Sequence, residues 1–167
     1  MTPAEIDFEE LFDAAPNPYL VLDADLVVRY ANRAYLQVTG RTLEELAGQY
    51  ILAAFPDTPA APAAARDFGA SLQRVLDSRE PDVVAPKRFD IPVSDRPGEL
   101  EERWWCGMAS PVLGPDGTVK WIIAQADDVT EFHVFPRHSW PHPAAEHAGN
   151  RDRGPDVCPV ARSGTTE

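Results

Sequence analysis

The sequence predicts an α+β domain, in which a five-stranded antiparallel sheet has helices on one face and an amphipathic helix at the N-terminus. Two apolar runs, 103–113 and 118–126, flank a Gly-Pro-Asp-Gly segment and predict two strands joined by a tight turn. Two shorter β-prone runs lie at 19–22 and 26–30. A helical pattern at 63–79 separates the two strand pairs. Strands that pair in chain order around intervening helices are typical of this class.

The N-terminal segment 3–15 predicts the amphipathic helix. Thr2-Pro3-Ala4-Glu5 has the form of a capping box with proline at the first helical position. Apolar residues follow at helical spacing, and Pro16 ends the helix because proline lacks a backbone donor. We expect this helix to cover part of the sheet face that the other helices leave open.

Short helices are predicted after the first strand pair. Asn32 has the side chain of an N-cap, and Gly40 suits the left-handed residue that ends a helix. Ligand contact is the functional alternative for Asn32. Thr42 to Glu45 matches a capping box and predicts one further turn. One more helical turn is predicted at 51–55, and Pro56 ends it.

The segment 57–62 is rich in proline and alanine and predicts a surface loop before the longest helix at 63–79. A strand at 82–93 follows, and Pro86 and Pro92 favour an edge position or a bulge for it. A turn at 94–98 leads into the next strand at Leu100.

The last strand is apolar on both sides. Alternation puts Trp121 and Ile123 on one face and Ile122, Ala124 and Ala126 on the other, so both faces of the sheet need cover. The polar segment 128–131 that follows predicts a cap or an anchor for the chain beyond the strand.

Charge and composition exclude several partners. The net charge is −12, and residues 1–135 contain 11 Lys and Arg against 23 Asp and Glu, so a direct nucleic-acid partner is not expected. No run approaches the roughly 20 apolar residues of a membrane span, and the N-terminus is acidic where a signal peptide is basic. We therefore expect no membrane association and a cytoplasmic location.

Residues 136–167 lack periodic apolar positions and predict a Pro- and His-rich disordered tail. The domain is accordingly assigned to residues 1–135, with its core at 18–131. His138 and His142 stand four residues apart, but Pro141 and Pro143 oppose the helix that such a metal site needs. We predict no metal site.

Four short motifs in order resemble the PAS sensor domains of signalling proteins. They are Asn32-Arg33-Ala34, the segment 43–48 after Gly40, the Asp116-Gly117 turn, and Asp128-Val129-Thr130 at the end of the last strand. The resemblance covers residues 8–131. It implies a PAS arrangement of sheet and helices, similar to the modules of bacterial sensor histidine kinases, in which Asp128 and Thr130 set the direction in which a signal leaves the domain.

A set of apolar residues is expected between the sheet and the helices. These residues either line a small apolar ligand pocket or fill the space as core, and the sequence leaves both open. They are Tyr35, Phe55, Phe68, Leu72, Phe89, Ile91, Trp104, Cys106, Met108 and Ala124.

Haem and covalently bound flavin are disfavoured on the PAS resemblance. Haem-binding members usually use a histidine in the helical half, whereas all four histidines here lie at or after His133. Photosensor members have a reactive cysteine in an Asn-Cys-Arg motif, which the segment 35–55 lacks. No cofactor is predicted, although a small apolar ligand is compatible with the sequence.

The function expected is a sensory or interaction module that passes a signal to a separate kinase, phosphatase or transcription regulator. A homodimer, or a complex with another PAS protein, is expected to form through Phe8, Leu11 and Phe12 of the helix and Trp121 and Ile123 of the sheet. The alternatives are a dimerisation scaffold with a filled core and a small α+β enzyme. Catalytic signatures such as Gly-x-Ser-x-Gly, His-Glu-x-x-His or a phosphate loop are absent from the sequence, so no enzyme activity is predicted.

Overall fold

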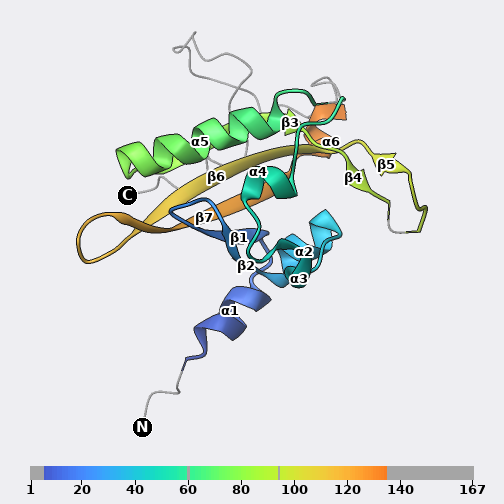
Figure 1. The fold of residues 1–167 in the computed structure, drawn as a ribbon. Helices are drawn as coiled ribbons and strands as arrows, with labels where there is room; N and C mark the ends of the chain where they lie inside the picture. The colour runs from blue at the N-terminus through green and yellow to red at the C-terminus, as the bar shows by residue number, and fades with distance from the viewer. Residues whose placement is uncertain (1–5, 60, 94, 135–167) are drawn as a thin grey trace, which may run out of the picture.

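The computed structural model describes residues 6–59, 61–93 and 95–134. Figure 1 shows a twisted antiparallel sheet with the longest helix, α5, running along it. The elements in chain order are α1 (Phe8–Ala14), β1 (Tyr19–Asp23), β2 (Val28–Ala31), α2 (Arg33–Thr39), α3 (Leu43–Leu46), α4 (Ile51–Ala54), α5 (Ala64–Ser78), β3 (Asp82–Arg88), β4 (Ile91–Pro92), β5 (Leu100–Glu101), β6 (Trp104–Leu113), β7 (Val119–Asp128) and α6 (Thr130–Val134).

The main sheet has five strands in the order β2-β1-β7-β6-β3, and every neighbouring pair is antiparallel. The C-terminal strand β7 therefore lies at the centre, with β1 on one side and β6 on the other. The predicted fold class and the five strands are confirmed.

One core lies between the sheet and helices α2 to α5. Leu46, Ile51 and Leu72 from the helices are fully buried together with Leu20 and Ile122 from the strands. Since side chains alternate along a strand, the buried positions on β1 and β7 define one inner face of the sheet. The prediction that Ile122, Ala124 and Ala126 face the helices agrees with this core.

Local turn chemistry accounts for most element boundaries. Gly40 adopts φ +64° at the end of α2, in the left-handed region that favours glycine. Thr42 and Glu45 form the predicted capping box of α3. In the β6–β7 hairpin Gly117 has φ +75°, and its N–H donates to the carbonyl of Gly114 at 3.0 Å.

Helix α1 begins at Phe8, later than the predicted start at residue 3. Asp7 is the N-cap, and its carboxylate accepts from the backbone N–H groups of Glu9 and Glu10 at 3.0 and 3.1 Å. The predicted capping box at 2–5 lies outside the described residues. The helix projects beyond the β1–β2 end of the sheet (Figure 1).

The strand expected at 82–93 is divided in the structure. The pairing of β3 with β6 shifts register between Val84 and Lys87, around Pro86, because proline has no N–H to donate to the ladder. Beyond β3 the chain forms β4, which pairs with β5 in a separate two-stranded sheet.

No helix in the described part of the chain is both long and apolar enough to cross a membrane. The predicted tail at 136–167 and its histidines lie outside the described residues.

Candidate functional site

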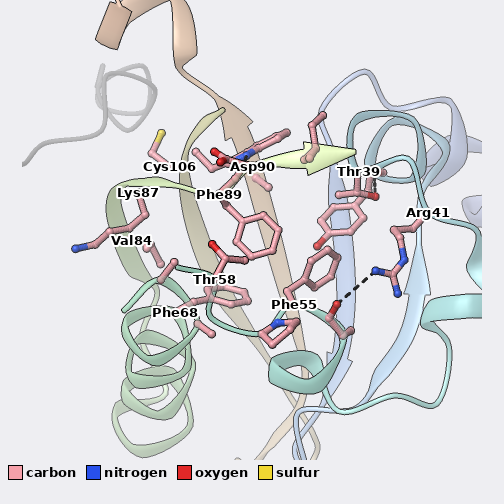
Figure 2. A pocket seen from close by; sticks show the side chains of 18 of the residues that line it. Thr39, Arg41, Phe55, Thr58, Phe68, Val84, Lys87, Phe89, Asp90 and Cys106 are labelled. Atoms are coloured by element: carbon pink, nitrogen blue, oxygen red, sulfur yellow. Dashed lines mark hydrogen bonds between the residues drawn. The ribbon is translucent and has the colours of Figure 1, made fainter. Parts of the chain in front are cut away.

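A cavity of about 320 Å³ lies between the sheet and the helices. This volume falls at the lower end of the range of ligand pockets, which begins at roughly 300 Å³. Figure 2 shows side chains from the helical half and from strands on the far side of the cavity pointing toward a common space. The aromatic part of the lining consists of Tyr35, Phe55, Phe68, Phe89 and Trp105.

Three of the rings contact one another in series. The ring centroids of Tyr35 and Phe55 are 6.3 Å apart at an interplanar angle of 84°. Those of Phe55 and Phe89 are 5.7 Å apart at 69°. Edge-to-face pairs of this kind are stabilising beyond the area that they bury, so the rings form an ordered wall.

The ends of α4 and β3 position Phe55 and Phe89, and a hydrogen bond positions Trp105. Phe55 follows the last turn of α4, and its backbone N–H still donates to the carbonyl of Ile51 at 3.1 Å. Phe89 follows β3, and its carbonyl accepts from the indole Nε1 of Trp105 at 2.9 Å. This hydrogen bond holds the indole of Trp105 in the position in which it lines the cavity.

Polar groups reach the same space. Tyr35 is buried, and burial raises the pKa of its phenol, while the nearby charge of Arg41 opposes part of that effect. Arg41 lines the cavity with its guanidinium carbon 5.7 Å from the centroid of the Phe55 ring. The phenol therefore stays protonated as a hydrogen-bond donor beside a cation.

Asp90 is the acidic residue of the lining, and Arg88 holds it. The Arg88 guanidinium donates to both oxygens of Asp90, at 2.8 and 2.9 Å, and also contacts Glu102 at 3.1 Å. These hydrogen bonds from Arg88 lower the pKa of Asp90 despite its burial. The carboxylate is ionised and already paired.

Six of the predicted pocket residues line the cavity, and they are Tyr35, Phe55, Phe68, Phe89, Ile91 and Cys106. Leu72 and Ala124 lie instead in the closed core, at 0% and 4% exposure. Core and cavity wall use the same apolar residue types, so the sequence pattern selected residues of both kinds.

The predicted face of β6 is wrong for Trp104 and Met108. Trp105, Gly107 and Ala109 stand opposite Asp128, Ala126 and Ala124 of β7, so they share its inner face. Trp104, Cys106 and Met108 therefore point to the outer face. Trp104 packs there with Cys106 and Val129, and Met108 is 40% exposed. Cys106 borders the cavity, but its sulfur points away from it in Figure 2.

The register error has a simple origin. Trp104 and Trp105 are adjacent, so either parity of the strand places one indole inside, and composition alone cannot choose between them. The sequence analysis consequently missed Trp105. It also missed Arg41, which follows the helix-ending Gly40 and belongs to no periodic pattern.

The end of β7 is held by the polar residues of the predicted exit. Asp128 accepts from the Thr130 N–H at 3.0 Å and from the Thr130 hydroxyl, and Arg103 Nη1 donates to Asp128 Oδ2 at 2.6 Å. Burial works to raise the pKa of Asp128, but the hydrogen bonds from Thr130 and Arg103 outweigh it and lower that pKa. The Thr130 hydroxyl also accepts from the Trp104 N–H at 2.9 Å, so the start of α6 is tied to the start of β6.

The predicted interface residues lie on the outer side of the molecule. Phe12 packs on the rings of Tyr19 and Tyr30, with centroids 5.6 and 5.9 Å apart. Phe8 and Leu11 of the same helix are 76% and 58% exposed. Trp121 and Ile123 are half-buried on the outer face of β7. Helix α1 thus covers only the β1–β2 end of this face.

A family model described as the PAS fold matches residues 12–134. The chain belongs to the PAS family. The solved PAS domain of BvgS from Bordetella pertussis is 29% identical, with 75% of this chain and 86% of that chain covered and a TM-score of 0.54. A PAS domain from Colwellia psychrerythraea is 15% identical, with 73% and 93% covered and a TM-score of 0.57. The LOV domain of the blue-light photoreceptor Aureochrome1 is 16% identical, with 75% and 91% covered and a TM-score of 0.52.

Comparison with curated protein sequences finds no match. The family match and the BvgS likeness identify the chain as a PAS sensory module of signal transduction. The two neighbours of lower identity support the fold alone.

Proposed function

We propose that this PAS module detects a small, largely apolar molecule in its cavity and passes the signal to a separate effector. The effector is a histidine kinase, a phosphatase or a transcription regulator, and the module acts in the cytoplasm as the non-catalytic partner. The observation that supports this most directly is the cavity of about 320 Å³ with its aromatic wall. A preformed apolar cavity with a few polar groups is the usual form of a small-molecule site.

The strand pairing offers a short connection from cavity to exit. Trp105 lines the cavity and stands directly opposite Asp128 in the β6–β7 ladder. The neighbouring residue Trp104 is hydrogen-bonded through its N–H and carbonyl to Thr130 and Val129, at 2.9 and 2.7 Å. A ligand that shifts the Trp105 indole would therefore act on the backbone that orients α6. This connection is part of the proposal and is tested with it.

The outer face of the sheet is the proposed contact with a partner. Val83, Met108 and Val112 are each about two-fifths exposed, at 43%, 40% and 38%, beside the half-buried Trp121 and Ile123. A monomer rarely exposes an apolar patch that extends over several strands. A second copy of the chain, or a PAS domain of a kinase-type protein, would cover this patch together with Phe8 and Leu11.

A cavity-filling variant tests the ligand proposal. Ala65 lines the cavity at the start of α5, whereas Ala70 is exposed on the same helix, so Ala65→Phe and Ala70→Phe form a matched pair. We expect naphthalene to bind wild type and Ala70→Phe in calorimetric titration, and Ala65→Phe to bind at least tenfold more weakly. Native mass spectrometry of protein from its own host should show a bound small molecule that Ala65→Phe lacks. Equal binding by all three proteins would refute the cavity as the ligand site.

Sedimentation tests the association proposal. We expect the wild type to form a dimer at micromolar concentration and Trp121→Glu to be monomeric, because a buried carboxylate without a partner opposes association. Ala70→Glu introduces the same charge on α5 and should remain dimeric. A wild type that is monomeric alone and in a mixture with a PAS-containing kinase would contradict this part of the proposal.

A further inference from the structure

Arg41 lines the cavity, and its guanidinium has hydrogen-bond donors that the protein uses only weakly. Its Nη1 donates to the Ala54 carbonyl at 3.5 Å, and its Nε lies 3.5 Å from Glu45 Oε2. Both contacts are longer than the usual 2.7–3.2 Å of N–H···O bonds, and a guanidinium has five N–H donors in all. Glu45 is also occupied elsewhere, since the same oxygen accepts from the Thr42 N–H at 2.9 Å. Most of the hydrogen-bonding capacity of Arg41 is therefore unused within the described part of the chain.

The hydroxyl of Tyr35 is a second donor at the same place. The residue is 7% exposed and lines the cavity, and its backbone groups bond with Asn32 and Thr39. Its hydroxyl forms no hydrogen bond with any residue in the described ranges. Because Tyr35 lines the cavity, this hydroxyl is available to donate its proton to a ligand that occupies the cavity. Tyr35 and Arg41 both contact the Phe55 ring, and the charge of Arg41 acts on the Tyr35 phenol.

The other charges that border the cavity are already paired. Lys87 Nζ contacts Asp67 at 2.8 Å, and in Figure 2 its amine points away from the cavity. Asp90 is held by the two-pronged hydrogen bond from Arg88. Arg41 is thus the cation that a ligand would meet within the lining, with a neutral phenol donor beside it.

We propose that the cavity binds an aromatic monocarboxylate of one or two rings, with its ring system among Phe55, Phe68 and Phe89 and its carboxylate on Arg41 and the Tyr35 hydroxyl. A guanidinium and a carboxylate form charge-assisted hydrogen bonds, which are stronger than hydrogen bonds between neutral groups. A cavity of about 320 Å³ fits such a molecule and limits its length. This inference rests on the proposed ligand-sensing function and specifies the chemistry of the ligand.

Calorimetric titration of the full chain with matched acids and amides tests the inference. The probes are phenylacetate against phenylacetamide and 2-naphthoate against 2-naphthamide, with naphthalene as a purely apolar probe. We expect each acid to bind at least tenfold more tightly than its amide to the wild type. Arg41→Gln should remove that preference while naphthalene still binds, and Tyr35→Phe, which keeps the ring, should reduce it several-fold.

The controls separate this inference from the function on which it rests. Arg33→Gln removes the same charge from an exposed position on α2 and should keep the tenfold preference. If naphthalene and the amides bind the wild type as well as the acids do, the carboxylate inference is refuted and the ligand-sensing proposal stands. If no probe binds the wild type, both are refuted. Thermal melts of each variant show whether a loss of binding reflects unfolding.

Discussion

We expect replacement of Asn32 by alanine to destabilise the domain strongly. The side chain is fully buried, and its Oδ1 accepts from the N–H groups of Tyr19 and Tyr35 at 2.9 and 3.0 Å. Its Nδ2 lies within 2.9–3.3 Å of the carbonyls of Phe12, Ala15 and Asn17. One amide therefore joins α1, the connection to β1, β1 itself and the first turn of α2.

The cost can be estimated from the groups that lose a partner in Asn32→Ala. Loss of the α2 N-cap costs about 1 kcal/mol. The Tyr19 N–H is left without its acceptor in a partly buried site, which costs about 1–3 kcal/mol more. The Phe12 carbonyl keeps the Ala15 N–H at 3.3 Å, so its contribution is small. The total is about 2–4 kcal/mol, a large fraction of the roughly 5–15 kcal/mol of a whole domain.

Urea unfolding followed by tryptophan fluorescence measures this loss as a lower midpoint at an unchanged slope. We expect the melting temperature to fall by roughly 10 °C as well. Asn17→Ala is the matched control, because the carbonyl that accepts from Asn32 is kept and only the amide side chain is removed. A loss below about 1 kcal/mol in Asn32→Ala, or one equal to that of Asn17→Ala, would show that the network contributes little beyond an ordinary cap.

Three further predictions concern other parts of the molecule. Hydrogen bonds from Arg74 lower the pKa of Asp82, so the stability that this carboxylate provides is present above its unfolded pKa of about 3.9 and is lost as the pH falls toward its folded pKa. The difference in the free energy of unfolding between wild type and Asp82→Asn should therefore shrink below a pH of about 4. A difference that does not depend on pH would contradict this. Gly107→Ala should cost about 1–3 kcal/mol in urea unfolding, because a Cβ there would lie 2.6 Å from the Gln125 carbonyl oxygen across the β6–β7 ladder, and an unchanged midpoint would show that the strands can separate freely. The purified protein should show neither a haem Soret band nor a light-reversible flavin absorbance, and either signal would overturn the cofactor prediction.

Much of the fold could be predicted because its turns depend on residues that are close in sequence. The capping box at Thr42 and Glu45, the left-handed Gly40 and the hairpin turn at 114–117 each follow from short-range chemistry and are present in the structure. The spacing of apolar residues likewise predicts the helix at 63–79, and α5 spans Ala64–Ser78.

Features that depend on pairing between distant segments were less predictable. The irregularity inside β3, between Val84 and Lys87, depends on how Pro86 lies opposite β6, and the proline alone indicated only an edge position or a bulge. The face of β6 depends on its register with β7, which two adjacent tryptophans leave undefined. In both cases the deciding interaction joins residues that are far apart in the chain.

The cavity is the feature that sequence patterns were least able to establish, since it depends on where side chains are too small to fill space. Ala54, Ala64, Ala65 and Ala126 line it together with the aromatic rings. In the sequence these alanines belong to an expected helical turn, to the start of the longest helix and to a buried strand, and none differs from an ordinary core alanine. Large rings hold the surrounding elements apart, and the alanines leave the space between those rings unfilled. These alanines therefore limit the size of the ligand that we propose, which is why Ala65→Phe tests the site more directly than removal of an aromatic ring.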